Sequence, residues 1–353
     1  MRRAFGILTL LVAAGLALDA EAQNDEKQST RPSLSIGGFS DINFSSTDEQ
    51  GVDSNSGFTE GQFVLHFVST LSDRVSFFAE VSLRALSSEF RTELERGIIK
   101  YSHSDYLKLS FGRFHTPINW WNTAFHHGQW LQTTVARPDV TAFGGEFIPV
   151  HFVGGMAEGA IPSGNVNLSY KVGIGNGRSE IISRGGDAGD VNNSRAWLVN
   201  LSGKPSNPFG LEFGGAFYRD KISPAVGEEF RESITSVYVV WTRETPEVIA
   251  EYARTDRDGV TTSQSFESDA YYIQVAYRLG HWKSRLKPYA RYEKIDLAAG
   301  EPVFGALTDR EGSIVGIRID TGAFLALKVE FRHQRSNLDP YVDGVFVQGS
   351  YAF

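Results

Sequence analysis

One stretch decides the fold: Val75-Ser76-Phe77-Phe78-Ala79-Glu80-Val81-Ser82-Leu83-Arg84. Its odd-numbered residues are apolar, and most of its even-numbered residues are polar or charged. Because successive side chains of a β-strand point to opposite faces, this period of two predicts a strand with one apolar and one polar face. A strand of this length, when tilted, can cross the apolar layer of a membrane.

The same alternation returns along the whole chain, for example in residues 271–279 and 325–332. Sixteen such segments can be counted, and an even number is typical of bacterial single-chain barrels. The sequence therefore predicts an all-β fold, a transmembrane antiparallel β-barrel. The expected strands are 34–44, 60–71, 75–86, 92–101, 106–114, 146–158, 166–175, 194–203, 211–219, 233–243, 247–254, 269–279, 286–294, 313–320, 324–333 and 344–353.

The connections between these strands alternate between short and long. The short ones are expected at 72–74, 102–105, 162–165, 245–246 and 321–323, and the long ones at 45–59, 115–145, 176–193, 255–268 and 297–312. Outer-membrane barrels have short periplasmic turns and longer external loops, whereas a soluble sandwich has no reason to keep this parity. The parity predicts a barrel with both chain ends at the periplasmic side.

The two ends of the chain carry their own signals. Arg2 and Arg3, the apolar run 6–18 and the small-residue site at 20–22 are typical of a secretory signal peptide. At the other end, Tyr351 and Phe353 resemble the C-terminal signal of bacterial outer-membrane barrels, with aromatics at the membrane interface. The expected organisation is a signal peptide at 1–22, a polar lead at 23–33 and a barrel at 34–353.

Composition excludes several classes. The chain has no cysteine, so disulfides, thiolate catalysis and cysteine zinc sites are excluded. The formal net charge is −8 and no basic domain stands out, which argues against a nucleic-acid partner. Beyond the signal peptide no apolar stretch has the length of a spanning helix, so membrane residence requires strands.

Three segments carry a family resemblance: residues 60–67, residues 93–100 and residues 107–117, the last with the step Gly112-Arg113-Phe114-His115-Thr116-Pro117. They resemble the phosphate-selective porin O/P family. The resemblance implies a sixteen-stranded, usually trimeric porin whose third external loop folds into the pore. In members that select phosphate it also implies a ladder of arginines and a lysine cluster. The stretch 115–145 is the third external loop by our count.

These expectations define two sets of candidate residues. The constriction loop and its flanks supply Arg113, His115, Trp120, Trp121, His126, His127, Trp130 and Arg137. The inward faces of the predicted strands supply the pore-lining set Glu80, Arg84, Lys108, Lys171, Glu212, Arg278, Arg318, Lys328, Glu330 and Arg332.

The aromatic and histidine residues of the loop allow two interpretations each. Trp120, Trp121 and Trp130 suit either a stacking platform for sugar rings or anchors that hold the loop to the barrel wall. His115, His126 and His127 suggest a metal site, but adjacent histidines in extended chain point apart and no carboxylate lies at ligand spacing. The sequence favours solvated loop histidines, with no metal and no cofactor.

The function expected from these patterns is a porin of the bacterial outer membrane. It would be surrounded by outer-membrane lipid, assemble as a homotrimer and pass small hydrophilic solutes or inorganic ions without transforming them. Acids and bases alternate on the inward faces, which favours weak charge selectivity. The alternative is an anion- or phosphate-specific channel, with Arg113 and Arg137 together at the narrowest point. From other classes, an outer-membrane hydrolase and a structural or adhesive barrel stay open; Ser102-His103 is the nearest approach to a catalytic pair.

Overall fold

The computed structural model describes residues 32–86, 88–142, 146–280, 285–304, 307–337 and 339–353. The chain divides into two units, Met1–Ser33 and Leu34–Phe353. The signal peptide expected at 1–22, and all but the last two residues of the expected lead, lie outside the described residues. Within the described ranges, no helix combines the length and the apolar character needed to cross a membrane.

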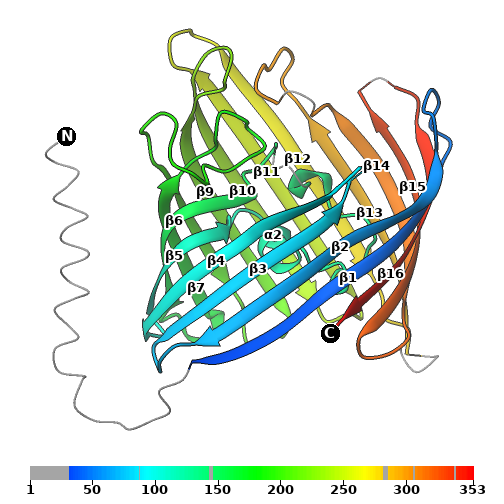
Figure 1. Ribbon diagram of the computed structural model, residues 1–353, viewed down its shortest axis with the longest axis horizontal. Coiled ribbons are helices and arrows are strands. Elements are labelled where there is room, and N and C mark those ends of the chain that lie inside the picture. The colour runs from blue at the N-terminus through cyan, green and yellow to red at the C-terminus, as the bar shows by residue number, and fades with distance from the viewer. Residues whose placement is uncertain (1–31, 87, 143–145, 281–284, 305–306, 338) are drawn as a thin grey trace, which may run out of the picture. The chain divides into compact units, whose positions relative to one another are not determined.

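The second unit is a closed antiparallel β-barrel in which each strand pairs with its neighbours in sequence, as predicted (Figure 1). Closure is made by β1 and β16, with Ile42 opposite Gly349. Its sixteen strands are β1 Ser33–Thr47, β2 Ser56–Thr70, β3 Val75–Ala85, β4 Phe90–Ser104, β5 Leu107–His115, β6 His151–Ile161, β7 Leu168–Asn176, β8 Ala196–Gly203, β9 Leu211–Ile222, β10 Phe230–Thr242, β11 Glu247–Gly259, β12 Ser265–Ala276, β13 Leu286–Asp296, β14 Arg310–Asp320, β15 Leu325–Ser336 and β16 Val342–Ala352.

The three longest connections, 116–150, 177–195 and 297–309, all lie at one end of the barrel, which we call the long-loop end. The opposite end, where β1 begins and β16 finishes, is the short-turn end. Two expected long loops are clearly shorter than predicted: the connection expected at 45–59 covers only 48–55, and the one expected at 255–268 is shorter still. Thr255 and Ser268 are paired within a continuous β11–β12 hairpin, so the connection is only 260–264.

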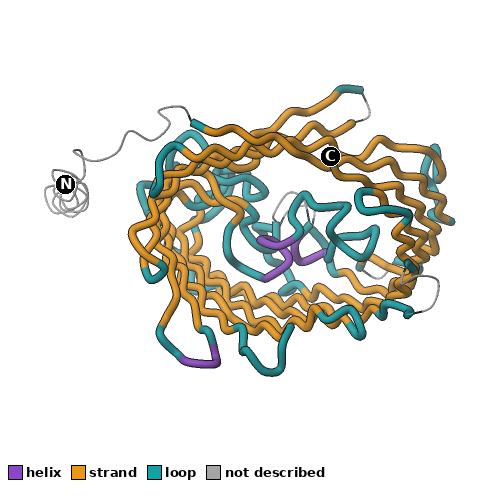
Figure 2. The backbone as a smooth tube through the Cα atoms, turned by 90° about the horizontal axis from the view of Figure 1, so that it is seen from below, coloured by secondary structure: helices purple, strands orange, loops and turns teal. Residues whose placement is uncertain are grey.

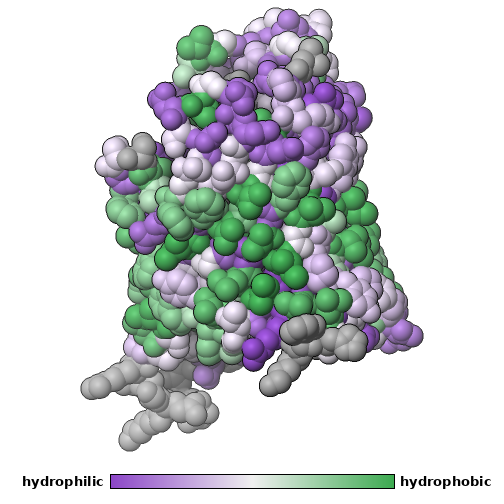
Figure 3. All heavy atoms as spheres, turned by 90° about the vertical axis from the view of Figure 1, so that its right-hand side faces the viewer, coloured by the Kyte–Doolittle hydropathy of each residue, from purple (hydrophilic) through white to green (hydrophobic). Residues whose placement is uncertain are grey.

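The two faces of the wall differ as the alternation predicts. Phe77, Val275 and Val329 are exposed on the outer face. Gln274 and Lys328, each next to one of these in sequence, are fully buried on the inner face. Figure 3 shows hydrophobic side chains gathered over the strands and hydrophilic ones over the long-loop end. An apolar outer wall of this kind suits contact with lipid.

Two local irregularities shape the wall between β3 and β5. The β3–β4 register shifts so that Glu80 faces Arg96 while Val81 faces Leu94, which leaves Glu95 as an extra residue. Such a bulge re-aims side chains, and here it turns both Glu95 and Arg96 inward. In β5, Gly112 has a φ of +142°, and a Cβ there would lie 1.9 Å from the Gly97 carbonyl oxygen. Only glycine fits this position, which explains in steric terms why the Gly112-Arg113-Phe114 step begins with a glycine.

Candidate functional site

The described residues of the connection 116–150 run inside the ring of strands, where Figure 2 shows its short helices surrounded by the barrel wall. It contains the helix α2, Trp120–Ala124, and the 3-10 helix η1, Asp139–Thr141. Many of its described side chains are fully buried, among them those of Ile118 and Asn122. The loop is therefore a packed part of the interior, as expected of an in-folded constriction loop.

Trp121 fixes the first half of the loop. Its side chain is fully buried against the rings of Phe125 and Tyr272, at centroid distances of 5.0 and 6.1 Å. Its backbone N–H donates to Oε1 of Glu251 on β11 at 2.7 Å. Of the two interpretations of the tryptophans, this geometry makes Trp121 an anchor, because a buried ring cannot stack on a solute.

The other two tryptophans also reach the wall. The indole N–H of Trp120 donates to Oε2 of Glu212 at 3.1 Å, and the ring of Trp130 stacks on Phe39 at a centroid distance of 6.2 Å. Both remain partly exposed, so a role in contacting solutes stays a prediction for these two residues.

The second half of the loop is held by acceptors and donors from β13 and β15. Oε2 of Glu330 accepts the backbone N–H of Val135 at 2.8 Å and the hydroxyl of Tyr289 at 2.9 Å. In the other direction, Arg291 donates to the carbonyl oxygen of Ala136 at 2.9 Å. The loop and the inner wall thus satisfy each other's buried polar groups.

Two residues of the predicted pore-lining set serve the same purpose. Nη1 of Arg318 donates to the carbonyl oxygens of Trp130 and Gln132 at 2.7 and 2.9 Å. Nζ of Lys328 donates to the carbonyl oxygen of Thr134 at 3.1 Å and also to that of Gln129. These bases are on the inner face, but the loop covers them.

Lysines gather on the inner face near the short-turn end. Nζ of Lys100 lies 2.5 Å from Oε1 of Glu158, and Lys108 and Lys171 act electrostatically on the same carboxylate. Lys204 lies 3.1 Å from Oε2 of Glu212. Sequence reasoning named Lys108 and Lys171 but missed Lys100 and Lys204, which join them only through the pairing of β4 to β9.

The remaining members of the pore-lining set are spread around the wall. Nε of Arg278 lies 3.0 Å from Glu244 near the short-turn end. Arg332 pairs with Glu330 at 2.7 Å and lies over the ring of Phe346 at 3.6 Å. Glu80 is buried and paired with Arg96 at 2.5 Å.

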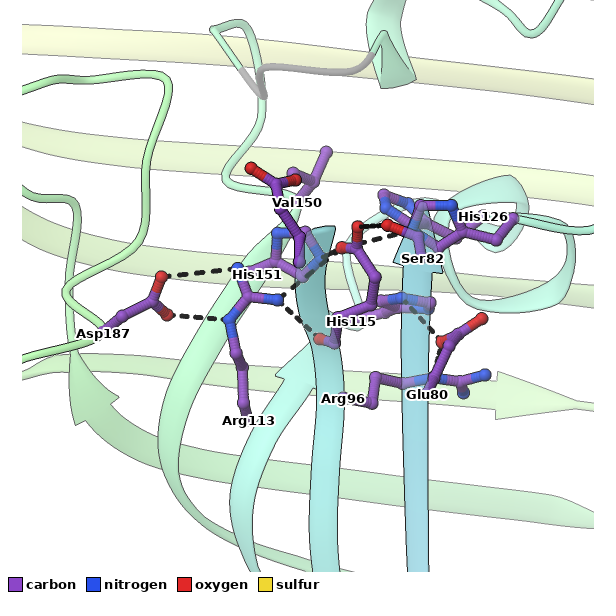
Figure 4. A network of polar contacts seen from close by, with 12 residues as sticks. Glu80, Ser82, Arg96, Arg113, His115, His126, Val150, His151 and Asp187 are labelled. Atoms are coloured by element: carbon purple, nitrogen blue, oxygen red, sulfur yellow. Dashed lines mark hydrogen bonds and ion pairs between the residues drawn. The ribbon is translucent and has the colours of Figure 1, made fainter. Parts of the chain in front are cut away.

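A cavity of about 160 Å³ lies between the wall and the loop at the long-loop end. Its charged lining contains Arg84, Arg91, Arg113, Arg184, Glu93, Glu95 and Asp187. Arg113 spans the cavity: its Nη1 donates to the Glu95 carbonyl oxygen at 2.6 Å, and its Nε donates to Asp187 at 2.7 Å (Figure 4). Four arginines against three carboxylates give this lining a net charge of +1, with His127 and His151 beside them.

Next to this cavity the structure corrects the expectation of solvated histidines. His115, His126 and His127 are only 4–6% exposed, and they meet a fourth histidine, His151. The ring centroids of His126 and His127 lie 4.4 Å apart. Adjacent histidines point apart only in extended chain, and these two lie in the turn that follows α2. The reason given against a metal site therefore does not hold for this geometry.

Strand pairing explains why His151 was missed. It is the first residue of β6 and the register partner of His115, the last residue of β5. The sequence placed β6 five residues too early, at 146–158, and so put His151 inside a strand. With the correct strand start, the sequence would have placed His115 and His151 at the loop-facing ends of neighbouring antiparallel strands. That placement would have added His151 to the candidate histidines.

Carboxylates also reach the cluster, from strands distant in sequence. Oε2 of Glu95 lies 3.1 Å from Nε2 of His127 and 3.0 Å from Nε2 of His151. Burial, together with neighbouring positive groups, holds the pKa of His126 well below its usual value, so its imidazole is neutral at pH 7. A neutral imidazole is the form that ligates a metal ion.

Neither protein-family models nor curated proteins match the chain. Solved structures do. An anion-selective porin from Comamonas acidovorans has a TM-score of 0.67 at 11% identity, over 92% of this chain and 100% of that one. The outer-membrane channel DcaP of Acinetobacter baumannii has a TM-score of 0.64 at 10% identity, over 93% and 99%. OmpT of Vibrio cholerae, in its trimer form, gives 0.59 at 14% identity, over 91% and 99%. The chain therefore has the fold of the sixteen-stranded porins.

Proposed function

We propose that the protein is a porin of the bacterial outer membrane, through which small hydrophilic solutes and inorganic ions diffuse. The observation that carries the proposal is a closed barrel with an apolar outer face and a long loop folded into its interior. Barrels of this strand number leave an aqueous channel unless it is filled. The loop, tied to the wall at Trp121 and Val135, is suited to set the width of that channel.

Anion preference is the second candidate, and the distribution of charge favours it over the weak selectivity expected from the sequence. The arginines of the cavity at the long-loop end and the lysines around Glu158 lie on the same part of the wall, between β3 and β9. Bases placed along one route attract anions and raise their local concentration. The anion-selective porin of Comamonas acidovorans has the same fold, and the likeness to the porin O/P family points the same way.

Acid at the rim opposes this preference. Hydrogen bonds from the side chains and backbone N–H groups of Thr261 and Thr262 hold the pKa of Glu228 at about 2, so this exposed carboxylate stays ionised. Rim charges act at long range and are screened by salt, whereas charges beside the permeating ion are screened less. We therefore propose a modest anion preference that grows as salt concentration rises.

A homotrimer is proposed as the assembly, since OmpT of Vibrio cholerae has this fold and forms a trimer. Cross-linking of native membranes followed by mass analysis tests this. A monomer as the only species would contradict it.

Planar-bilayer recordings of the full chain test the channel itself. The expected result is stepwise insertion of open, ohmic channels, with a reversal potential in a potassium chloride gradient that favours chloride. A membrane that stays sealed, although the protein is inserted and folded, would overturn the porin proposal. Channels with a zero reversal potential would keep the porin and remove the anion preference.

A further inference from the structure

We propose that His115, His126, His127 and His151 form a binding site for one divalent transition-metal ion of the zinc class, which clamps the constriction loop to β5 and β6. The site goes beyond the channel function and does not depend on it. Its ligands come from three elements: the end of β5, the loop after α2 and the start of β6.

The distances suit a metal after a small contraction. One ligand nitrogen from each of the four histidines lies within 4.8 Å of all the others. In a tetrahedral zinc site with metal–nitrogen bonds of about 2.0–2.1 Å, ligand nitrogens are about 3.4 Å apart. Two of the four histidines are on a loop, so movements of less than about 1 Å bring the set to ligation geometry.

The burial of His115 is an independent reason to expect a bound ion. His115 is 6% exposed, and among the described residues neither of its ring nitrogens has a hydrogen-bond partner. Its closest charged contact is Oε2 of Glu80, 3.5 Å from its Nε2. A buried polar group without a hydrogen bond is costly, and the cost is removed if a bound ion takes its lone pair.

Amide oxygens hold two of the rings from behind. Nδ1 of His126 lies 2.9 Å from Oδ1 of Asn122, and Nδ1 of His127 lies 3.0 Å from Oε1 of Gln62. The orientation of Asn122 is fixed, because its Nδ2 donates to the carbonyl oxygen of Thr116 at 2.8 Å. When an oxygen accepts the Nδ1–H, the lone pair is on Nε2, the atom that ligates the ion in ordinary histidine metal sites. In His127 this Nε2 also faces Oε2 of Glu95 at 3.1 Å, so an ion bound there would meet the carboxylate as well.

The charges around the cluster allow a cation of moderate affinity. Glu80 and Glu95 border the histidines and attract a divalent ion. Arg96, Arg113 and Arg137 also lie nearby, but Arg96 is paired with Glu80 and Arg113 with Glu95 and Asp187 (Figure 4). Nη2 of Arg137, 3.2 Å from Nδ1 of His126, is the group that opposes binding most directly. Imidazole ligands favour zinc, copper and nickel over magnesium or calcium.

The ion has a way in. The cavity of about 160 Å³ is lined by His127 and His151 together with Glu95 and Gln62. Its lining extends to Arg184 and Asp187 of the connection 177–195. A cation entering there passes four arginines and three carboxylates before it meets His127 and His151, so the path slows entry but leads to two of the ligands.

Cobalt spectroscopy of the folded full chain in detergent tests the site. After treatment with a chelator and its removal, Co²⁺ is titrated while visible absorption is recorded, and Zn²⁺ is then added. We expect saturation at one Co²⁺ per chain, the strong bands of tetrahedral nitrogen coordination, and loss of the bands when Zn²⁺ displaces the cobalt. Weak bands of octahedral cobalt, or no saturation, would overturn the proposal whatever the variants do.

The matched variants are His126→Gln and His127→Gln, with His103→Gln as the control, because His103 is an exposed histidine near the short-turn end. Loss of a ligand should weaken Zn²⁺ binding by about tenfold or more, since removal of even an outer partner costs that much. His103→Gln should bind as the parent does. Folding of each variant is checked by its heat-dependent mobility in detergent gels. Equal affinity in all folded variants would overturn the assignment of these ligands.

Discussion

The backbone N–H of Val135 donates to Oε2 of Glu330 at 2.8 Å, which joins the in-folded loop to the inner face of β15. The same carboxylate accepts the N–H of Ala136 at 3.1 Å through its other oxygen. This side chain therefore acts together with Arg291, Arg318 and Lys328 in holding the second half of the loop against the wall. The position of the loop depends on an acceptor that carries a full negative charge.

Glu330→Gln should loosen this attachment. The amide keeps the size of the side chain but offers one acceptor instead of two, and hydrogen bonds to charged groups contribute about 1.5–3 kcal/mol. We expect a folded barrel whose single-channel current is noisier and whose mean conductance is higher. Glu267→Gln, at an exposed carboxylate near the long-loop end, serves as the control. Current noise equal to that of the control would show that Glu330 does not position the loop.

A charged residue placed on the outer face should destabilise the barrel. Val275→Arg places a cation on the exposed apolar side of β12, one residue before the strand ends. Such a change costs about 2–4 kcal/mol at the middle of the membrane and less towards its interfaces, so the barrel should be destabilised. Ser169→Arg is the matched change on the inner face, where Ser169 pairs with Ser202 at 2.8 Å. Urea titrations of folding into lipid vesicles measure both. Equal stability of the two variants would mean that the faces are assigned the wrong way round.

Alternation predicted the barrel because it is a local signal. In β3, apolar and polar residues follow one another closely enough to reveal both faces, and β12 repeats the pattern. Strand ends were less accurate: β11 and β12 extend beyond the predicted limits because Thr255 and Ser268 continue to pair. Residues at such ends are polar on both faces and carry no periodic signal.

The site was predicted only in part, because its geometry comes from pairing. The loop was predicted as the long connection 115–145, and Arg113 and His115 stood out in the step before it that resembles the porin O/P family. Glu95 was missed because the bulge that turns it inward has no mark in a single sequence. His151 was missed because its contact with His115 depends on register.

The lysines around Glu158 should control charge selectivity. Replacing both Lys108 and Lys171 by glutamine removes two positive charges from the inner face while Lys100 continues to pair with Glu158. The reversal potential in a potassium chloride gradient should shift towards cations. Arg74→Gln, at an exposed turn position, should leave it unchanged. The same shift in both variants would mean that net charge, and not position along the channel, sets the selectivity.

Topology can be tested on intact cells. An epitope inserted at Asp53 or Gly189, both exposed at the long-loop end, should be labelled from outside. One at Gly322, in the turn before β15, should be labelled only after the outer membrane is opened. Labelling of an epitope at Gly322 on intact cells would show that the barrel is inserted in the opposite orientation.

The loop should narrow the channel and also cover two bases of the wall. Replacing residues 122–134 by a flexible glycine-serine linker tests both roles. The strands pair with each other and not through the loop, so the barrel should still fold. Conductance should rise because a packed segment leaves the interior.

The same replacement uncovers two bases. Arg318 and Lys328 lose the loop carbonyls that now cover them but keep Asp320 and Gln348 as partners, at 2.8 and 2.9 Å. These bases then face water, so anion preference should rise together with conductance. Higher conductance without a change in selectivity would show that neither base lines the path. Unchanged conductance would place the loop outside it.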